Sequence, residues 1–406
     1  MTAQSSPSSQ PAEARSGPTP AVPPIRPELG VSIFSRMAAL AVRTGAVNLG
    51  QGFPDGGGPA AMLARAQREI AAGNNQYAPA VGVRSLREAV AEQRADRYGT
   101  GFDPDTEVVV TAGATEAITA AVLAFCRPGD EVVVFEPYYD SYAAATVMAG
   151  ATRRAVPLRY TEGEFRFDPD ELTAAFSDRT RVLIMNTPHN PTGKVFTAEE
   201  LATIAELCRR HDVLIVSDEV YEYLTYDGVR HVPVATSAPE RTLSVSGLGK
   251  TFSATGWRVG WACGPAELVA AVTSVKQYAS FTAATPFQLA AVTALRECMD
   301  WVEELRRSLT VRRDLLSGAL REAGIEVYPT SGSYFLQADA RSFGTDDGMA
   351  LCLDLPERAG VVAVPSVAFF DHPEAGRHLV RLAFCKDEAT LIEGAKRLVG
   401  YRDAVA

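Results

Sequence analysis

The feature that most constrains the fold is an alternation, from about residue 105, of apolar runs rich in β-branched residues with segments of helical periodicity. The runs typical of buried strands are residues 107–113, 131–137, 152–158, 181–188, 213–220 and 241–247. Helical segments such as "EAITAAVLAFC" and "AEELATIAELCRR" lie between them. Strands that alternate with helices form α/β domains with a largely parallel sheet. The sequence therefore predicts such a domain.

The last quarter of the chain has a different pattern. A long amphipathic segment covers residues 286–323, and the short strand-like runs "SYFLQAD" and "HLVRLAF" follow it, with helical segments near 345–357 and 387–399. This mixture predicts a smaller α+β domain, against which the N-terminal piece around "NLGQGFPD" packs. The expected parts are a disordered extension (1–27), the N-terminal part of the small domain (28–60), a large domain (61–295) and the C-terminal small domain (296–406).

Composition restricts the partners and the compartment. The formal net charge of -10 argues against binding to nucleic acid or anionic membranes, because both need a basic surface. No apolar run approaches the roughly 20 residues of a membrane span. The six cysteines are dispersed and form no C-x-x-C pair, which favours a reducing compartment. We therefore expect a cytoplasmic protein, and we expect no metal site.

Polar residues stand at the ends of several predicted strands, at Asn186, Asp218 and Ser246. In open α/β sheets, ligands bind at the carboxyl ends of the strands. The segments around this edge are "AGATEAI" (112–118), "EPYYDSY" (136–142), "NTPHNPTG" (186–193), "SDEVY" (217–221) and "SVSGLGKTFSATGWRVG" (244–260). Taken singly, each has a structural explanation: a strand-to-helix turn, packed tyrosines, a proline turn or a helix cap.

The last of these segments contains Gly-Lys-Thr, the end of a nucleotide-binding P-loop. A P-loop also requires a glycine five residues before Gly249, and that residue is Ser244. Lys250 is one of only five lysines in the chain. We therefore interpret Lys250 as a group that does chemistry, with a phosphate held by other residues.

A single cofactor explains the five segments together. Pyridoxal phosphate needs a lysine amine, a carboxylate for its pyridine nitrogen, donors to its phenolic oxygen, a stacking aromatic ring and a phosphate cup. Residues from about 30 to 400 resemble the class I and II aminotransferases of the fold-type I pyridoxal phosphate enzymes. Within them, the chain is most similar to the subgroup of kynurenine, glutamine and methionine transaminases and actinobacterial N-succinyldiaminopimelate aminotransferases.

The resemblance implies both an architecture and an activity. It implies a large domain with a mostly parallel seven-stranded sheet, a smaller α+β domain, and a homodimer with shared active sites. The activity is the transfer of an amino group between an L-amino acid and a 2-oxo acid by a ping-pong mechanism, with pyridoxal 5'-phosphate as cofactor.

The resemblance also assigns the contacts of the cofactor ring. Lys250 lies in a pattern like the family's K-x-x-x-x-x-G-x-R-x-G and resembles the lysine that forms the Schiff base. Asp218 resembles the carboxylate that pairs with the pyridine nitrogen, and Tyr221 resembles the donor to the phenolic oxygen. Asn190 would share that oxygen, and Tyr139 would stack on the ring. Lys250, Asp218 and Tyr221 are thus the expected catalytic residues.

The phosphate of the cofactor would lie at the start of a helix, beside an arginine and a tyrosine from a second subunit. The residues that resemble these groups are Gly113, Ala114, Thr115, Arg258 and Tyr77. Many relatives carry a serine three residues before the lysine, where this chain has Gly247. Either Ser246 substitutes for that phosphate donor, or the donor is missing.

The substrate residues are fewer. Arg381 in "HLVRLAF" resembles the arginine that binds the substrate α-carboxylate, helped by the Gly52 backbone and Asn190. Phe281 and Phe287 are expected to border the pocket, and no further arginine is placed to bind a side-chain carboxylate. We therefore expect a range of apolar, aromatic or sulfur-containing amino acids. The alternatives are β-elimination from cysteine conjugates, oxidation of arginine-like substrates, and a non-catalytic ligand-sensing domain.

Overall fold

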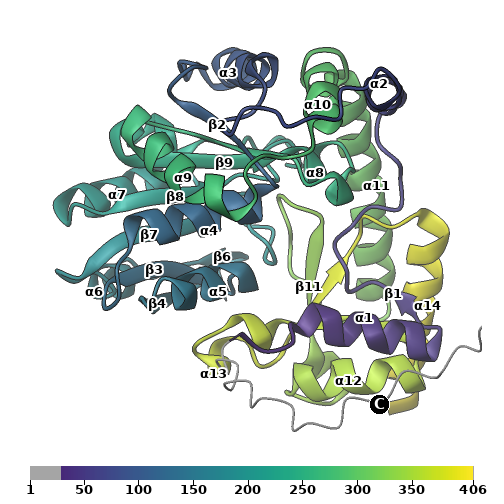
Figure 1. Ribbon diagram of the computed structural model, residues 1–406. Coiled ribbons are helices and arrows are strands. Elements are labelled where there is room, and N and C mark those ends of the chain that lie inside the picture. The colour runs from purple at the N-terminus through teal and green to yellow at the C-terminus, as the bar shows by residue number, and fades with distance from the viewer. Residues whose placement is uncertain (1–28, 406) are drawn as a thin grey trace, which may run out of the picture.

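The computed structural model describes residues 29–405, so the expected disordered extension over 1–27 lies outside the described part (Figure 1). Its largest sheet has seven strands in the order β2-β10-β9-β8-β7-β3-β4. These strands are β2 (Val108–Thr111), β3 (Glu131–Glu136), β4 (Thr152–Pro157), β7 (Thr180–Asn186), β8 (Leu214–Asp218), β9 (Thr242–Gly247) and β10 (Gly260–Cys263). Only β10 runs antiparallel to its neighbours within this sheet. The prediction of an α/β fold with a mostly parallel seven-stranded sheet is confirmed.

The six strands predicted from apolar runs are all present, whereas the sequence pattern misses β10. This strand, Gly-Trp-Ala-Cys, contains no β-branched residue, whereas β2, which is equally short, consists of three valines and a threonine. The pattern also misses a small hairpin of β5 (Arg159–Thr161) and β6 (Glu164–Arg166) beside the main sheet.

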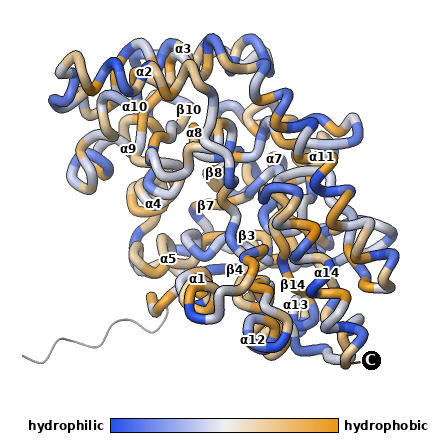
Figure 2. Tube along the Cα trace, turned by 90° about the vertical axis from the view of Figure 1, so that its right-hand side faces the viewer, coloured by the Kyte–Doolittle hydropathy of each residue, from blue (hydrophilic) through white to orange (hydrophobic). Residues whose placement is uncertain are grey.

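Helices cover both faces of the large sheet. One face packs on α4 (Ala114–Phe125), α5 (Asp140–Met148) and α9 (Ala266–Ala279). The other packs on α6 (Pro169–Ala174) and α7 (Ala198–Arg210) and, near β2 and β10, on α2 (Ala60–Ala71), α3 (Arg84–Tyr98) and α10 (Thr285–Glu297). Figure 2 shows β7 and β3 between α4 and α5 on one side and α7 on the other. The layered arrangement leaves the carboxyl ends of the parallel strands open to a ligand.

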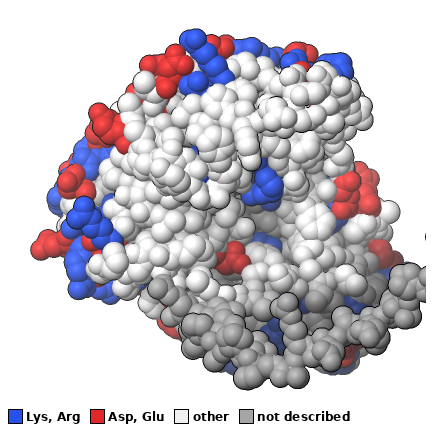
Figure 3. Space-filling model, in the orientation of Figure 1, with Lys and Arg blue, Asp and Glu red and all other residues white. Residues whose placement is uncertain are grey.

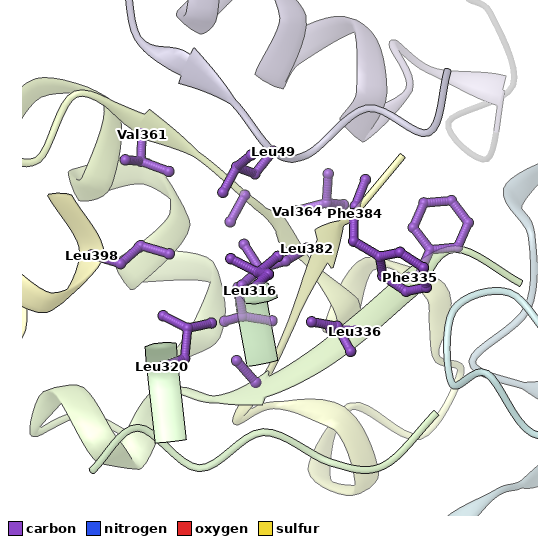
Figure 4. Packing of buried hydrophobic residues seen from close by; sticks show 14 of the residues in the cluster. Leu49, Leu316, Leu320, Phe335, Leu336, Val361, Val364, Leu382, Phe384 and Leu398 are labelled. Atoms are coloured by element: carbon purple, nitrogen blue, oxygen red, sulfur yellow. The ribbon is translucent and has the colours of Figure 1, made fainter. Parts of the chain in front are cut away.

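The smaller part of the molecule is built around a second core. Its antiparallel sheet has the order β11 (Phe335–Asp339), β14 (Leu379–Ala383) and β13 (Val364–Pro365), and β1 (Val47–Asn48) pairs in parallel with β12 (Val361–Val362). The helices around these strands are α1 (Ile33–Thr44), α11 (Met299–Glu322), α12 (Gly348–Arg358), α13 (Pro373–Gly376) and α14 (Glu388–Val405). Figure 4 shows Leu49 from the N-terminal segment among Leu382 and Leu398 from the end of the chain.

Short elements complete the chain near the sheet edges. They are the one-turn helix α8 (Leu248–Thr251) and 3-10 turns at Val234–Thr236, Pro239–Arg241, Thr255–Trp257, Ala340–Phe343 and Ser366–Phe369. The amphipathic segment over 286–323 consists of two helices, α10 and α11, which are divided at Cys298. Within residues 29–405, no helix has the length and apolar character needed to cross a membrane.

Candidate active site

A cavity of about 380 Å³ opens at the carboxyl ends of β7 and β8, between the large sheet and the smaller core. Figure 3 shows a recess in the middle of one face, with a few basic side chains inside it and most other charged side chains at the periphery. All but two of the predicted site residues line the cavity: Gly52, Gly113, Ala114, Thr115, Tyr139, Asn190, Asp218, Tyr221, Lys250, Arg258 and Arg381. The two that do not are Ser246 and Tyr77.

Asp218 is the last residue of β8 and is buried, with 5% of its surface exposed. The hydroxyl of Tyr142 donates a hydrogen bond to its Oδ2 at 2.6 Å, and the backbone N–H of Val220 donates to its Oδ1 at 3.2 Å. Burial raises the pKa of Asp218 to about 6, although both donors oppose the shift. A buried carboxylate of this kind suits a cationic partner, such as a protonated ring nitrogen.

Tyr142 is a site residue that the sequence interpretation missed. It is buried in the first turn of α5, three residues after Tyr139, so the two rings lie on neighbouring parts of one helix face. Their centroids are 5.9 Å apart in an edge-on arrangement. The i, i+3 spacing of the two tyrosines in "EPYYDSY" was the signal for this residue.

Lys250 lies in α8, and its Nζ donates a hydrogen bond to the carbonyl oxygen of Gly52 at 3.1 Å. The hydroxyl of Tyr334 donates to the same oxygen at 2.5 Å. The ammonium also lies 5.9 Å from the ring centroid of Tyr221 and 5.5 Å from that of Tyr334. Burial lowers the pKa of Lys250 to about 8, so a substantial fraction of the amine is uncharged in mildly alkaline solution.

The phosphate end of the cavity is formed by the start of α4 and by Arg258. Gly113 caps the helix with a φ of 82°, and a Cβ atom there would clash with the guanidinium of Arg258. Gly260 packs against the same helix start: a Cβ atom added to Gly260 would lie 2.7 Å from the backbone nitrogen of Ala114. The free N–H groups of a helix start, together with an arginine, form a site for a dianion.

Ser246 is a correction to the sequence interpretation. Its Oγ donates a hydrogen bond of 2.6 Å to Oε1 of Glu222, on the side of β9 that faces away from the cavity. Side chains alternate along a strand, so Gly247 is the residue that faces the cavity, and it has no hydroxyl. Thr115 and Thr255 supply the threonine hydroxyls in the cavity lining.

Arg381 lies on β14 and is 2% exposed. Its two terminal nitrogens donate to Oδ1 of Asn190 at 3.1 Å and to the carbonyl oxygen of Gly50 at 2.7 Å. Its guanidinium lies 4.1 Å from the ring centroid of Phe335, and its Nε has no hydrogen-bond partner within residues 29–405. Burial lowers the pKa of Arg381 to about 10. A buried guanidinium with a free donor suits a carboxylate ligand.

Asn186 is a residue that the sequence placed at the ligand-binding edge of the sheet without assigning it a role. It lines the cavity at the end of β7, and its Nδ2 donates to the backbone oxygen of Asp218 at 2.8 Å. Its Oδ1 accepts a hydrogen bond from the backbone nitrogen of Asn190 at 2.6 Å. Asn186 therefore joins the turn that carries Asn190 to the strand that carries Asp218.

Three predicted aromatic residues lie outside the cavity of this chain. Tyr77 is 83% exposed and packs edge-on against Phe281, whereas Phe287 stacks on Trp257. The expectation that Phe281 and Phe287 border the pocket is wrong for the cavity of a single chain. The aromatic residues there, besides the tyrosines, are Phe34, Phe53 and Phe335.

The donor set fits pyridoxal phosphate. The cavity holds a carboxylate for a ring nitrogen, an amine of lowered pKa and an anion cup with glycines where a Cβ would intrude. With the parallel sheet, these features define a fold-type I pyridoxal phosphate transferase.

The chain belongs to the family "Aminotransferase class I and II", whose sequence profile matches residues 44–398. The protein is an aminotransferase that moves an amino group between an L-amino acid and a 2-oxo acid by a ping-pong mechanism, with pyridoxal phosphate as its cofactor. The predictions of this family, activity and cofactor are confirmed.

The chain is similar to named aminotransferases over about nine tenths of its length. It is 50% identical over 378 residues to a protein of Mycobacterium tuberculosis described as a probable N-succinyldiaminopimelate aminotransferase, covering 90% of this chain and 95% of the relative. It is 41% identical to the methionine aminotransferase of Escherichia coli, with coverage of 92% and 96%.

Solved structures of such proteins superpose closely. The N-succinyldiaminopimelate aminotransferase of M. tuberculosis gives a TM-score of 0.90, covering 92% of this chain and 97% of that one. An E. coli protein with a methionine aminotransferase function gives 0.89, with coverage of 94% and 100%. These relatives are named for transamination, so elimination, oxidation and ligand sensing without catalysis gain no support from them.

Proposed function

We propose that Lys250, Asp218 and Tyr221 are the catalytic residues of this aminotransferase and that Arg381 binds the α-carboxylate of its substrates. The observation that carries this proposal is that the four side chains converge on one cavity from β8, α8, β14 and the loop after β8. When bound, pyridoxal phosphate supplies an electron sink for the pair of electrons that the Cα–H bond releases.

Lys250 moves the proton in this scheme. Its lowered pKa of about 8 lets the amine accept a proton from the substrate Cα near physiological pH and then release it again. Asp218 stabilises the positive charge of the protonated ring nitrogen, because an ionised carboxylate beside that nitrogen favours its protonated form. Tyr221, buried beside Lys250, is the proposed donor to the phenolic oxygen.

The remaining residues of the cavity hold the cofactor and orient the substrate. We propose that Tyr139 stacks on the cofactor ring, that Asn190 shares its phenolic oxygen, and that Arg258 and the helix start at residues 113–115 bind its phosphate. Arg381 forms a two-point contact with the substrate carboxylate and so aligns the Cα–H bond with Lys250. Asn190 assists through its contact with Arg381, and Gly52 contributes its backbone.

The lining of the cavity favours uncharged substrate side chains. Lys250, Arg258 and Arg381 are the basic residues among its described lining, and each already has a proposed role. The remaining wall near Arg381 is aromatic, with Phe34 and Phe335 packed around the guanidinium. We propose apolar, aromatic and sulfur-containing amino acids as donors. A second candidate is N-succinyldiaminopimelate, which the relative with 50% identity suggests.

We also propose a cytoplasmic homodimer with shared active sites, in which Tyr77 reaches the phosphate of the partner subunit. Tyr77 and Tyr278 are 83% and 88% exposed, and Phe281 beside Tyr77 is 43% exposed, a concentration of exposed aromatic rings that suits an interface with a second copy. All six cysteines are free and buried, which supports a reducing compartment.

The two groups of elements suggest two domains. We propose that residues 28–60 and 296–406 form one domain, because β1 pairs with β12, and that residues 61–295 form the other. The division near residue 295 lies close to the break between α10 and α11 at Cys298.

A donor screen on purified holoenzyme tests the substrate proposal. Each amino acid is mixed with enzyme alone, and conversion of the cofactor to its amine form is followed by absorbance. Methionine and phenylalanine should convert it with at least about tenfold higher kcat/KM than aspartate. Faster reaction with aspartate would contradict the proposal, and N-succinyldiaminopimelate as the best donor would favour the second candidate. Release of ammonia and a 2-oxo acid without conversion would indicate elimination.

Mixing a Tyr77 variant, which should bind the cofactor weakly, with an inactive Lys250 variant tests the shared site. In a mixture of Tyr77→Phe and Lys250→Ala chains, some heterodimers carry one site with both residues intact. Such a mixture should recover activity relative to the Lys250 variant and bind the cofactor more tightly than the Tyr77 homodimer. A fully active monomer in sedimentation at assay concentration would contradict the shared site, without affecting the roles of Lys250 and Asp218.

A further inference from the structure

A buried charged cluster lies behind the cavity, next to α3. Its charged members, Arg94, Glu219 and Glu222, have at most 1% of their surfaces exposed. The group that we call the Arg94 cluster consists of Arg94, Tyr98, Ser217, Glu219, Glu222, Ser244 and Ser246. None of these residues is part of the cavity lining. The cluster is therefore separate from the groups that contact cofactor or substrate.

Arg94 connects the two carboxylates with one atom. Its Nη1 lies 2.8 Å from Oε2 of Glu219 and 3.2 Å from Oε2 of Glu222. Its Nε and Nη2 have no hydrogen-bond partner in the described part of the chain. Burial alone would raise the pKa of Glu219, but the Arg94 guanidinium and the buried imidazole of His231, whose Nε2 lies 3.4 Å from Oε2 of Glu219, hold that pKa at about 2. Arg94 thus helps to keep the Glu219 carboxylate charged where water does not reach it.

Hydroxyl groups donate further hydrogen bonds to the two glutamates. Ser217 and Ser244 donate to Oε1 of Glu219 at 2.9 and 3.2 Å. Ser246 donates to Oε1 of Glu222 at 2.6 Å, and Tyr98 donates to its Oε2 at 2.8 Å. Each glutamate is consequently fixed to β9 by a serine and to α3 by Arg94.

The glutamates alternate with the proposed catalytic residues. Asp218 and Tyr221 face the cavity, whereas Glu219 and Glu222, the next residue in each case, face the cluster. The regular pairing of β8 with β9 ends at Asp218, and one more backbone hydrogen bond to β9 follows, from the N–H of Glu219 to the oxygen of Val245 at 2.7 Å. Beyond Glu219, the side-chain contacts of Glu222 hold the segment to β9 and α3. Since adjacent residues share a rigid peptide unit, a backbone displacement at a glutamate moves its catalytic neighbour.

We propose that Arg94, Glu219 and Glu222 are positioning residues for transamination, which hold residues 218–222 from behind and thereby fix Asp218 and Tyr221 toward the cofactor. The proposal rests on the roles of Asp218 and Tyr221 given under Proposed function. Loss of one contact in the cluster shifts these groups slightly, and reacting groups tolerate little displacement.

Ser246→Ala and Arg94→Lys test the proposal, because the first removes one hydrogen bond and the second keeps the charge. The matched control is Thr242→Val on the same face of β9. Thr242 is 1% exposed and donates to the Ala238 oxygen at 2.7 Å, outside the cluster. Three quantities are measured for each holoenzyme: the pH midpoint of the cofactor absorbance, the cofactor dissociation constant, and kcat with KM for one amino donor.

Ser246→Ala should lower kcat about tenfold with KM changed less than about twofold. It should also move the absorbance midpoint by about half a pH unit or more. Arg94→Lys should change kcat and the absorbance midpoint less than Arg94→Gln does, because lysine keeps the positive charge. Thr242→Val should lower the urea midpoint as much as Ser246→Ala does, with the absorbance midpoint and kcat unchanged.

Asp218→Asn separates the two ways in which the proposal could fail. If Asp218→Asn moves the absorbance midpoint but the cluster variants that fold do not, the positioning role is overturned. The same holds if Thr242→Val moves the midpoint as far as Ser246→Ala, since the effect is then general loss of stability. If Asp218→Asn itself changes nothing, the assigned role of Asp218 fails, and with it the basis of this inference.

Discussion

Replacement of Asp218 by asparagine should stabilise the cofactor-free enzyme while it disables the loaded one. Asp218 is buried and accepts hydrogen bonds from Tyr142 and Val220. Burial raises its pKa from 3.8 to about 6, so the folded state binds this proton more tightly than the unfolded state does. The ionised carboxylate therefore opposes folding until a cation is bound beside it.

The pKa values give the magnitude and the sign of the effect. The difference between the pKa of 3.8 in the unfolded chain and that of about 6 in the folded protein corresponds to a free energy of about 3 kcal/mol. This contribution to stability is fully present below about pH 4, where Asp218 is protonated in both states, and it is lost as the pH rises through about 6. Asparagine carries no charge and can still accept from Tyr142. The variant should match the wild type near pH 4 and exceed it by up to about 3 kcal/mol at pH 8.

The assay is equilibrium urea denaturation of both cofactor-free proteins at the two pH values, followed by tryptophan fluorescence. Turnover of the loaded variant serves as the functional comparison and should fall at least tenfold, or about 1.4 kcal/mol. A wild type as stable as the variant at pH 8 would refute the argument that burial strains this carboxylate. Turnover within about threefold of wild type would show that Asp218 only caps the segment after β8.

Three other substitutions test separate parts of the site. Arg381→Lys should lower kcat/KM for amino donors at least about tenfold, because an ammonium cannot form the two-point contact; an unchanged value in steady-state kinetics would contradict the carboxylate role. Gly113→Ala should raise the cofactor dissociation constant about tenfold or more, since its methyl group clashes with Arg258 and φ is 82°, and fluorescence titration measures this. Tyr142→Phe should raise the pKa of Asp218 by about one unit in the cofactor-free enzyme; infrared titration of the carboxyl band would show no shift if the 2.6 Å hydrogen bond is unimportant.

The sequence was most informative where local pattern decides structure. The β-branched runs at residues 131–137 and 181–188 predicted β3 and β7, because strands buried on both faces need continuous apolar sequence. Polar residues at the ends of predicted strands also predicted the cavity, because the carboxyl ends of parallel strands meet at one edge of the sheet. The sequence pattern missed β10 because its residues, Gly-Trp-Ala-Cys, include no β-branched side chain.

The site was less predictable where it depends on the face of a strand to which a side chain points, or on contacts between residues far apart in the sequence. Ser246 was assigned to the phosphate although its place on β9, two residues after Ser244, puts both hydroxyls on one face. Tyr142 and Arg94 meet Asp218 and Glu219 only through the tertiary fold, at separations of 76 and 125 residues. Such contacts have no local signature in a single sequence.

The central claim is that Lys250 is the amine that holds the cofactor. Borohydride reduction of the holoenzyme, followed by digestion and mass spectrometry, tests this directly, because it fixes the cofactor permanently to the amine that carries it. The chain has five lysines, and Lys250 is the one that lines the cavity. We predict that the added mass lies on the peptide containing Lys250 and that Lys250→Ala enzyme retains none. Mass found on Lys276 or Lys386 instead, or turnover close to normal in Lys250→Ala, would contradict the claim.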